Sequence, residues 1–509
     1  MNRPLLNRPL LAALAGFKLV LHLLLANGYG YFRDEMYFLD CGRHLAFGYV
    51  DHAPFIALVA RAALAMGGSL VALRVFPAVA GAMLVGLAVL IAWRLGGGAF
   101  AQALAGLAVI AAPVFLAVHG MLTMNAFEPV FWMGGAYCLI RIVEGDDPRW
   151  WLGFGVLLGL GLENKHSTMF FGIAAAAALL LSPERRSLRT RWPWLAAALA
   201  LALILPNLVW QAQHDFPTLE DLGNVRRIGK NVVPGPVDFV GQQVLLLHPV
   251  LLPLWLAGLA WLFAGARGRY RLLGWTYVVF FVMLFALEGK NYYLAPIYPM
   301  LFAAGAVAVD AALDRWAVTR GRLWPKAAIV LVIVAAAAVL APLTLPILPP
   351  ERYVVYEKAL GITPPKTEVG HRGPLPQHFG DRFGWPELVA EVARIYHALP
   401  AGDRARAAIF ANNYGEAGAV NLFGPQYGLP PAISAHQTHF LWGPGGNTGE
   451  VLIVLQDDRE TLEGICASVE EAGVHFHPWG MAEENNPIFI CRGLHPPLPE
   501  MWPRLKKWN

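Results

Sequence analysis

Long apolar segments recur through the first two thirds of the chain, and they constrain its fold more than any other feature. A helix of about 20 apolar residues spans the hydrocarbon core of a bilayer, and we count about eleven segments suited to such helices. Of the 509 residues, 57% are hydrophobic and 15% are charged, whereas soluble domains carry about 25% charged residues. The sequence therefore predicts an α-helical polytopic membrane protein. The expected spans are 10–28, 70–93, 100–118, 126–143, two short spans within 150–181, 194–210, 244–264, 272–287, 294–313 and 327–348.

Basic residues indicate how these spans are oriented. Clusters of arginine and lysine fall between spans at 185–191, 267–271 and 315–326. Lys and Arg are enriched in cytoplasmic loops, so we expect the amino terminus inside and the carboxyl end outside. The net charge of +4 is small for this length and gives no reason to expect nucleic acid as a partner.

The character of the chain changes near residue 349, where proline, glycine and charged residues rise and long apolar runs stop. Strands alternating with helices favour a small α/β domain, which this orientation places outside the membrane. The expected helices are 386–398 and 459–472, and the expected strands are 407–411, 451–455 and 488–491. Residues 412–416 are interpreted as a strand-to-helix turn. We thus predict a transmembrane catalytic domain at 1–348 with a long first outer loop at 29–69, and an extracytoplasmic α/β domain at 349–509.

Two cysteines of the second domain, Cys466 and Cys491, would share the oxidising side of the membrane. They could form a disulfide there. Two separate buried thiols explain them equally well.

The first outer loop carries a group of charged residues directly after the first apolar segment. Acidic residues this close to a bilayer are costly unless they are paired or used. Asp34 is our candidate catalytic base, with Glu35 beside it, and Arg33, Asp51 and His52 are candidate substrate-binding residues. The plainer interpretation is a solvated acidic loop.

Three further polar clusters lie at the ends of predicted spans that face the outside. They are Asn125 with Glu128, Lys165 with His166, and Lys290 with Tyr292 and Tyr293. Each has a purely structural alternative. Glu128 could favour the start of a helix, and Lys290 could be an interfacial anchor beside an aromatic belt.

This set of side chains suits a sugar donor that is linked to a polyprenyl phosphate. Lysine supplies a point charge for phosphate, and we assign the donor phosphate to Lys165 and Lys290 together with Tyr292 and Tyr293. A carboxylate can accept a proton from an acceptor hydroxyl or amine, which is the role of Asp34. A lipid phosphate leaves without protonation, so the carboxylate pair of glycoside hydrolysis is not needed. Asn125, Glu128 and His166 would contact substrate.

No cofactor is predicted, because the chain has no phosphate-binding loop of the Walker type and its cysteines lack metal-ligand spacing. Carboxylates and His52 could hold a divalent metal. We favour a reaction without one, since two lysines can carry the phosphate charge.

Three stretches of the sequence resemble the membrane glycosyltransferases of the GT-C type. They are Arg33-Asp34-Glu35, Gly-Tyr-Val-Asp-His-Ala-Pro at 48–54, and Lys-Asn-Tyr-Tyr-Leu-Ala-Pro-Ile-Tyr-Pro at 290–299. Among these enzymes the chain is most similar to the bacterial group that includes protein O-mannosyltransferases and the lipid A aminoarabinose transferase.

The resemblance implies a GT-C fold and transfer, with inversion, of a sugar from a polyprenyl-phosphate donor to a lipid, glycan or protein acceptor. The reaction would take place at the outer face of a bacterial cytoplasmic membrane, with membrane lipids around it and Asp34 as the base. Many relatives carry an aspartate at the start of the fourth span, where this chain has Asn125, with Glu128 one turn further on. Either Glu128 takes over that role or the acceptor differs.

Two other functions use some of the same features. An oligosaccharide ligase or polymerase would move a glycan from a diphosphate carrier. It differs from the predicted glycosyltransferase only in its donor. A transporter would need polar residues along a path through the membrane, and preferably internal repeats. The charges here gather at one face, which makes transport the weaker alternative.

Overall fold

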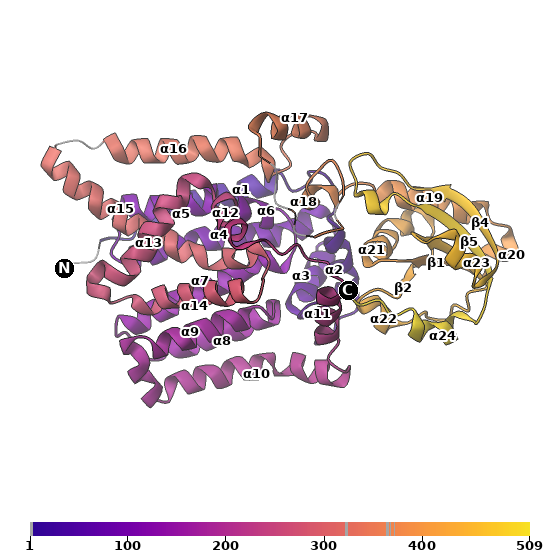
Figure 1. Ribbon diagram of the computed structural model, residues 1–509, viewed down its shortest axis with the longest axis horizontal. Helices are drawn as coiled ribbons and strands as arrows, with labels where there is room; N and C mark the ends of the chain where they lie inside the picture. Colours follow the sequence, from indigo (N-terminus) through magenta and orange to yellow (C-terminus); the bar gives the residue numbers. More distant parts are fainter. Residues whose placement is uncertain (1–3, 321–323, 363–365, 367, 371) are drawn as a thin grey trace. The chain divides into compact units, whose positions relative to one another are not determined.

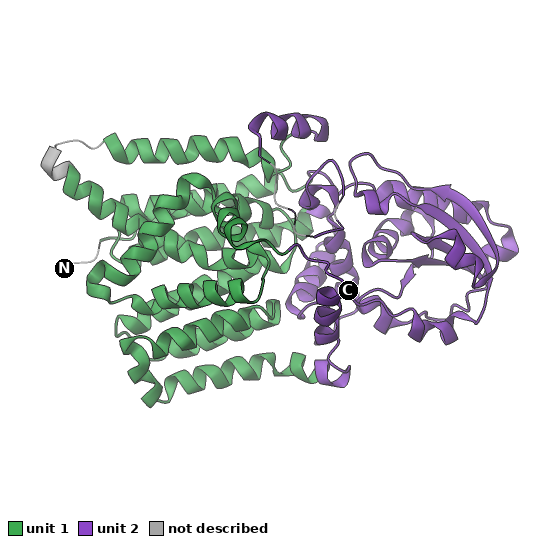
Figure 2. Ribbon diagram, in the orientation of Figure 1, with its two compact units in different colours: residues 1–27, 71–209, 233–348 green, residues 28–70, 210–232, 349–509 purple. Residues whose placement is uncertain are grey.

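The chain forms two compact units in a computed structural model that describes residues 4–320, 324–362, 366, 368–370 and 372–509. Unit 1 consists of residues 1–27, 71–209 and 233–348, and unit 2 of residues 28–70, 210–232 and 349–509 (Figure 2). The segment that follows the first span thus belongs to the same unit as the C-terminal region.

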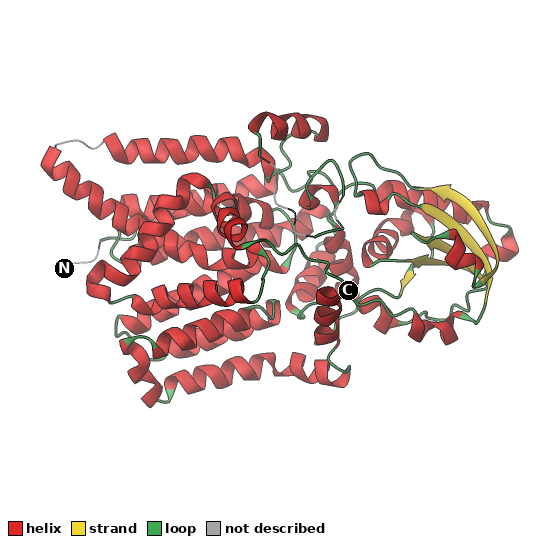
Figure 3. Ribbon diagram, viewed as in Figure 1, coloured by secondary structure: helices red, strands yellow, loops and turns green. Residues whose placement is uncertain are grey.

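Unit 1 is built of helices (Figures 1 and 3), as the apolar segments predict. A helix or a pair of helices occupies every predicted span. They are α1 (Arg8–Leu24), α4 (Leu70–Arg94), α5 (Ala99–Ala111), α6 (Pro113–Val118), α7 (Met124–Val143), α8 (Trp150–Asn164), α9 (Thr168–Leu180), α10 (Trp192–Gln213), α12 (Pro236–Leu247), α13 (Leu252–Ala264), α14 (Arg271–Ala286), α15 (Tyr298–Arg320) and α16 (Trp324–Leu340), with 3₁₀ turns η1 (Pro183–Arg189), η2 (Pro249–Leu251), η3 (Gly265–Gly268), η4 (Asn291–Ile297) and η5 (Ala341–Leu343).

Six helices in the described part of the chain are long and apolar enough to cross a membrane. They are 70–94, 124–143, 192–213, 249–268, 291–316 and 324–343. The polytopic helical class is therefore confirmed, while the number of about eleven spans stays a prediction, because helices such as α9 and α14 are shorter than a full crossing.

The predicted span at 100–118 is wrong in one respect, because it is two helices. The residue before a proline is biased toward an extended conformation, and Ala112 before Pro113 takes one, which separates α5 from α6. Two carbonyls of α6 lie within hydrogen-bond distance of side chains on α1. Lys18 Nζ donates to the Phe115 carbonyl at 2.8 Å, and a ring nitrogen of His22 lies 3.2 Å from the Leu116 carbonyl. These buried polar side chains satisfy backbone groups that would otherwise be costly in an apolar bundle.

Unit 2 contains a five-stranded mixed sheet in the order β2-β1-β3-β5-β4, in which β1 pairs in parallel with β2 and β3, and β5 pairs antiparallel with β3 and β4. Its strands are β1 (Ala407–Ala411), β2 (Ile433–Ser434), β3 (Val451–Leu455), β4 (Cys466–Val474) and β5 (Pro487–Leu494). Its helices are α2 (Arg33–Arg43), α3 (Phe55–Ala65), α11 (Pro217–Arg227), α17 (Pro350–Leu360), α18 (Gln377–Gly380), α19 (Trp385–Ala398), α20 (Ala401–Arg404), α21 (Tyr414–Phe423), α22 (Thr438–Trp442), α23 (Arg459–Glu463) and α24 (Leu498–Met501), with η6 (Gly424–Tyr427), η7 (Ala482–Glu484) and η8 (Trp502–Arg504).

The strands expected at 407–411, 451–455 and 488–491 and the helix at 386–398 are confirmed. The helix expected at 459–472 is wrong. It stops after α23, and the chain continues as strand β4, which pairs with β5 at the edge of the sheet. Glutamates and alanines favour a helix only weakly, and tertiary pairing overrides that preference. The exposed Glu470 and Glu471 on β4 are the kind of charge that protects an edge strand from further pairing.

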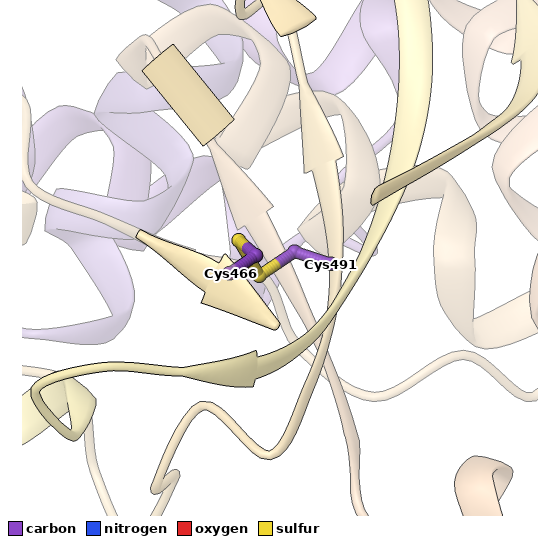
Figure 4. Close-up of a disulfide and its surroundings, with 2 residues drawn as sticks. All are labelled: Cys466 and Cys491. Atoms are coloured by element: carbon purple, nitrogen blue, oxygen red, sulfur yellow. A yellow bond between two sulfur atoms is a disulfide. The ribbon is translucent and has the colours of Figure 1, made fainter. Parts of the chain in front are cut away.

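The edge strand is also joined covalently to its neighbour. Cys466 and Cys491 form a disulfide between β4 and β5 with their Cα atoms 5.7 Å apart (Figure 4). The open choice between a disulfide and two thiols is thus resolved in favour of the disulfide.

Removing this bond is expected to lower the stability of unit 2. The cysteines lie 25 residues apart, and closing a loop of that size stabilises a fold by about 2–4 kcal/mol. Thermal unfolding of the purified Cys466→Ala/Cys491→Ala protein, followed by circular dichroism in the β-sheet region, should therefore occur at a lower temperature than that of the parent. An unchanged transition would contradict the expectation.

Candidate functional site

The first turn of α2 presents Asp34 and buries Glu35. The backbone N–H of Phe32 donates to the Glu35 carboxylate at 2.9 Å, and the Glu35 N–H donates to the Phe32 carbonyl at 2.9 Å. Glu35 is fully buried, and this reciprocal bonding starts the helix. The side chain of Asp34 is 32% exposed. Of the two carboxylates, Asp34 is therefore the accessible one. Glu35 is buried and caps the first turn of α2.

Asp34 is held by a tyrosine that the sequence interpretation missed. The Tyr414 hydroxyl donates to Asp34 Oδ1 at 2.9 Å, and the Arg33 guanidinium lies 4.0 Å from the same oxygen. Arg33 also stands over the Tyr414 ring, 5.4 Å from its centroid, and contacts Asp381 at 3.6 Å. Arg33, Asp34, Tyr414 and Asp381 are called the Asp34 cluster below.

Local sequence explains why Tyr414 reaches α2. Residues 412–416 form the predicted turn from β1 into α21, and the Asn413 side chain caps α21 by accepting from the Glu416 N–H at 3.0 Å. Gly415 and Gly418 then let α2 approach closely, because a Cβ at either position would collide with Arg33 or with the backbone of Met36. The turn is structural, as predicted, and it also presents Tyr414 to the carboxylate.

Burial raises the affinity of the carboxylates in the Asp34 cluster for protons. Burial raises the pKa of Asp34 above its usual range, while the Arg33 charge and the Tyr414 hydroxyl act against that rise. Burial likewise raises the pKa of Asp381 to about 7, again opposed by Arg33. A carboxylate with a raised pKa can accept a proton from a substrate hydroxyl near neutral pH.

Asp51 and His52 lie in the same unit but have different surroundings. The Tyr37 hydroxyl donates to Asp51 Oδ1 at 2.7 Å, and burial raises the pKa of Asp51 to about 6. His52 is buried and stacked on Tyr49 with 4.5 Å between the ring centroids. Its Nδ1 lies 2.9 Å from the Ala53 carbonyl, and burial lowers the pKa of His52 to about 4. His52 is therefore a neutral, packed imidazole at neutral pH, which is the arrangement of a core side chain.

In unit 1, segments far apart in the sequence meet around Lys165. Lys165 Nζ donates to Asn125 Oδ1 at 2.7 Å and to Glu128 Oε2 at 3.3 Å. It also stands 4.1 Å from the ring centroid of Tyr293 and 5.9 Å from that of Tyr292. The Lys165 cluster, as defined by these five residues, draws on the start of α7, the turn after α8, and η4.

The surroundings of this cluster are partly apolar and partly polar. The side chains of Lys165 and Glu128 are 13% and 3% exposed, and the Ser167 hydroxyl donates to the other Glu128 oxygen. Glu128 supplies a carboxylate to the Lys165 ammonium, and the Tyr293 ring supplies an aromatic face, which attracts a cation. The structure thus unites three of the predicted polar clusters at one lysine.

Two predicted residues lie beside the Lys165 cluster. A ring nitrogen of His166 is 3.0 Å from Asn207 Oδ1, a partner on α10 that the sequence did not suggest. Lys290 is half-buried and immediately precedes η4. The next residue, Asn291, anchors that turn by donating from Nδ2 to Gln242 Oε1 at 2.6 Å.

Comparison with known proteins agrees with the predicted resemblance. Residues 51–210 match the model of the dolichyl-phosphate-mannose-protein mannosyltransferase family. The lipid A galacturonosyltransferase RgtD of Rhizobium johnstonii is 31% identical over 147 residues, which are 28% of this chain and 30% of that protein. The chain therefore matches less than a third of the length of this curated relative.

The whole chain is similar in fold to a solved membrane protein. The crystal structure of ArnT from Cupriavidus metallidurans bound to undecaprenyl phosphate has a TM-score of 0.58 and 14% identity, covering 94% of this chain and 97% of that one. The apo form of the same protein has a TM-score of 0.60 at 14% identity and the same coverage. The fold is ArnT-like, and the resemblance to membrane glycosyltransferases of the GT-C type is confirmed.

Proposed function

We propose that this protein transfers a sugar from a polyprenyl-phosphate donor to lipid A or a related acceptor at the outer face of a bacterial inner membrane. The observation that carries the proposal is the convergence of three predicted clusters on Lys165. Two of the similar proteins also support the proposal. The ArnT structure is bound to undecaprenyl phosphate, and RgtD is a lipid A galacturonosyltransferase.

In the proposed reaction, Lys165 and Lys290 neutralise the phosphate of the donor, and Tyr292 and Tyr293 pack against it. Cationic groups stabilise a reaction where negative charge develops. The acceptor hydroxyl attacks the anomeric carbon while Asp34 takes its proton. The bond from the anomeric carbon to the phosphate oxygen breaks, and the lipid phosphate leaves with the electron pair. A single displacement of this kind inverts the configuration of the sugar.

The remaining predicted residues take supporting roles in this proposal. Asn125 and Glu128 hold the Lys165 ammonium in place, and Arg33 holds the Asp34 cluster together. Asp51 and His166 remain candidates for contacts with substrate. His52 stacks on Tyr49 and packs edge-on against Tyr37 and Phe38 of α2.

The disulfide supports the proposed orientation of unit 2. Disulfides persist in oxidising compartments such as the periplasm and are rare in the cytosol. A bond between Cys466 and Cys491 therefore agrees with an extracytoplasmic C-terminal region, as the distribution of basic residues also predicts.

A donor panel tests the proposal directly. The purified protein in nanodiscs receives lipid A and polyprenyl carriers that bear the same sugar on a monophosphate or on a diphosphate. We expect the monophosphate carrier to be consumed and the acceptor to gain one sugar mass. Consumption of the diphosphate carrier alone would favour the ligase or polymerase. EDTA should leave the rate unchanged, and loss of activity with rescue by magnesium would overturn the metal-free scheme.

Replacing Tyr414 with phenylalanine is expected to move the pH dependence of turnover. The Tyr414 hydroxyl holds the pKa of Asp34 down, so its loss lets that pKa rise further. A base must be deprotonated to act, hence the acidic limb of the rate profile should shift to higher pH, with the rate recovering in alkaline buffer. Rates at a series of pH values for wild type and Tyr414→Phe measure this. A uniform fall at every pH would instead indicate a structural role for the hydroxyl.

A further inference from the structure

Unit 1 contains a cavity of about 350 Å³ that the proposed chemistry does not use. It lies among α8, α9 and α10, which run side by side (Figure 1), at the end where α7 finishes and α8 begins. Lys165 follows the other end of α8, a helix of 15 residues that is about 22 Å long. The cavity is therefore separate from the Lys165 cluster, and its volume falls within the range of ligand pockets, about 300–1,000 Å³.

Short side chains on two neighbouring helices leave this space open. A glycine brings α8 against α10, since a Cβ on Gly155 would stand 2.5 Å from the Ala196 carbonyl oxygen. Where α9 and α10 border the cavity, they present alanines, among them Ala175, Ala176 and Ala197. Protein interiors are otherwise packed densely. The cavity thus follows from the alanine-rich sequences of α9 and α10, whose side chains are too short to fill it.

The cavity is apolar and reaches the surface of unit 1. Its lining is made of leucine, alanine, tryptophan, phenylalanine, glycine and proline residues. Trp151 and Phe154 in this lining are 5% and 7% exposed, whereas Leu180 and Trp194 are 59% and 62% exposed. Apolar cavities of this kind exclude water and take apolar guests. In a membrane protein the acyl chain of a lipid is such a guest, and it can enter from the exposed side.

A basic turn adjoins this exposed side. The turn η1 contributes Leu188 to the lining, and Trp194 Nε1 donates to the Leu188 carbonyl at 2.9 Å, which ties the turn to the start of α10. Residues 183–191 carry four exposed arginines and one half-buried glutamate, namely Arg185, Arg186, Arg189, Arg191 and Glu184. Each arginine lies within three residues of Leu188, so positive charge gathers next to the apolar cavity.

This excess of positive charge favours an anionic lipid headgroup over a zwitterionic one. The N–H donors of a guanidinium match the oxygens of a phosphate. The distribution of Lys and Arg predicts that residues 183–191 face the cytoplasm, where anionic lipids attract basic residues beside a membrane span.

We propose that the cavity binds an anionic glycerophospholipid of the inner leaflet, with an acyl chain among α8, α9 and α10 and its phosphate on the arginines of residues 183–191. An apolar cavity and a cluster of cations side by side match the two halves of such a molecule. The site is distinct from the proposed donor and acceptor sites, and its existence does not depend on the reaction that the protein catalyses.

Lipid binding to the purified full-length protein tests the site. Native mass spectrometry in detergent would compare phosphatidylglycerol with phosphatidylcholine that carries the same acyl chains. We expect phosphatidylglycerol to bind at least about tenfold more tightly. Equal affinity for the two lipids would overturn the role of the arginines. A polyprenyl phosphate added as competitor should leave phosphatidylglycerol in place, and displacement would assign the cavity to the chain of a sugar donor instead.

One pair of variants assigns the binding to the cavity. Ala197→Phe places a ring in the cavity from an exposed position in its lining and should weaken phosphatidylglycerol binding by at least about tenfold. The matched control is Leu201→Phe, one turn along α10, at a residue that is 56% exposed and outside the lining. Its affinity should equal that of the parent. Unchanged binding in Ala197→Phe would overturn the site.

A second pair of variants separates a headgroup site from a general effect of positive charge. Arg185→Gln/Arg186→Gln should lose most of the preference for phosphatidylglycerol over phosphatidylcholine. Arg267→Gln/Arg269→Gln removes two exposed charges from the other basic turn, which is outside the lining, and should keep that preference. If both variants lost the preference equally, the arginines would act only through the overall charge of the protein, and the proposed site would be wrong.

Discussion

Replacing Asp34 with asparagine is expected to reduce transfer from a polyprenyl-phosphate sugar by about 10²–10⁴-fold, the usual contribution of a general base. The substitution should leave the fold intact, because an amide oxygen can still accept the hydrogen bond that Tyr414 donates at 2.9 Å. Affinity for the lipid donor should change little, since the proposed phosphate contacts come from Lys165 and Lys290. Single-turnover loss of the lipid-linked sugar, measured together with donor binding, separates these two effects.

The matched control is Asp458→Asn. Asp458 caps the exposed helix α23 by accepting from the Thr461 N–H at 2.8 Å, and asparagine is an equally good cap. Full activity in Asp458→Asn beside lost activity in Asp34→Asn would assign the effect to Asp34. Wild-type turnover in Asp34→Asn would move the proposed base to Asp51, whose pKa burial raises to about 6, or to Glu35.

Asp34 could be singled out as a candidate from local sequence, but its hydrogen-bond partner Tyr414 could not. A carboxylate directly after an apolar span is conspicuous because charge near a bilayer is costly. Tyr414 lies 380 positions away, at the start of α21. The sequence around it is already explained by the helix cap at Asn413, so it gives no sign of a contact with Asp34. Only the close approach of α2 and α21, which Gly415 and Gly418 permit, brings the two side chains together.

The same contrast holds for the other candidate residues. Topology alone suggested that the clusters near Asn125, Lys165 and Tyr293 face one side, and the structure brings them into contact. The sequence could not show that His52 would be a packed neutral ring, because that depends on Tyr49 stacking against it. Strand β4 was missed for the same reason, because its pairing with β5 is a tertiary interaction that local sequence does not reveal.

Replacing Lys165 with methionine is expected to have an effect of similar size, by a different mechanism. Methionine keeps much of the apolar length of lysine and removes the charge, so the leaving phosphate loses one of its proposed cations. Removing one group that stabilises developing charge typically slows a reaction by about 10²–10³-fold. Lys165→Met also leaves Glu128, with a side chain only 3% exposed, without its ion-pair partner, and breaking a buried pair in this way costs about 3–5 kcal/mol.

A second substitution distinguishes catalysis from stability. In Lys165→Met/Glu128→Gln the buried carboxylate is gone, so thermal stability should recover most of the loss, while turnover should stay low because the cation is still missing. Lys165→Arg, which keeps the charge in a different geometry, should retain part of the activity. If the double variant recovered turnover together with stability, the Lys165 cluster would be a structural ion pair, and the donor phosphate would have to be bound by Lys290 and residues other than those proposed here.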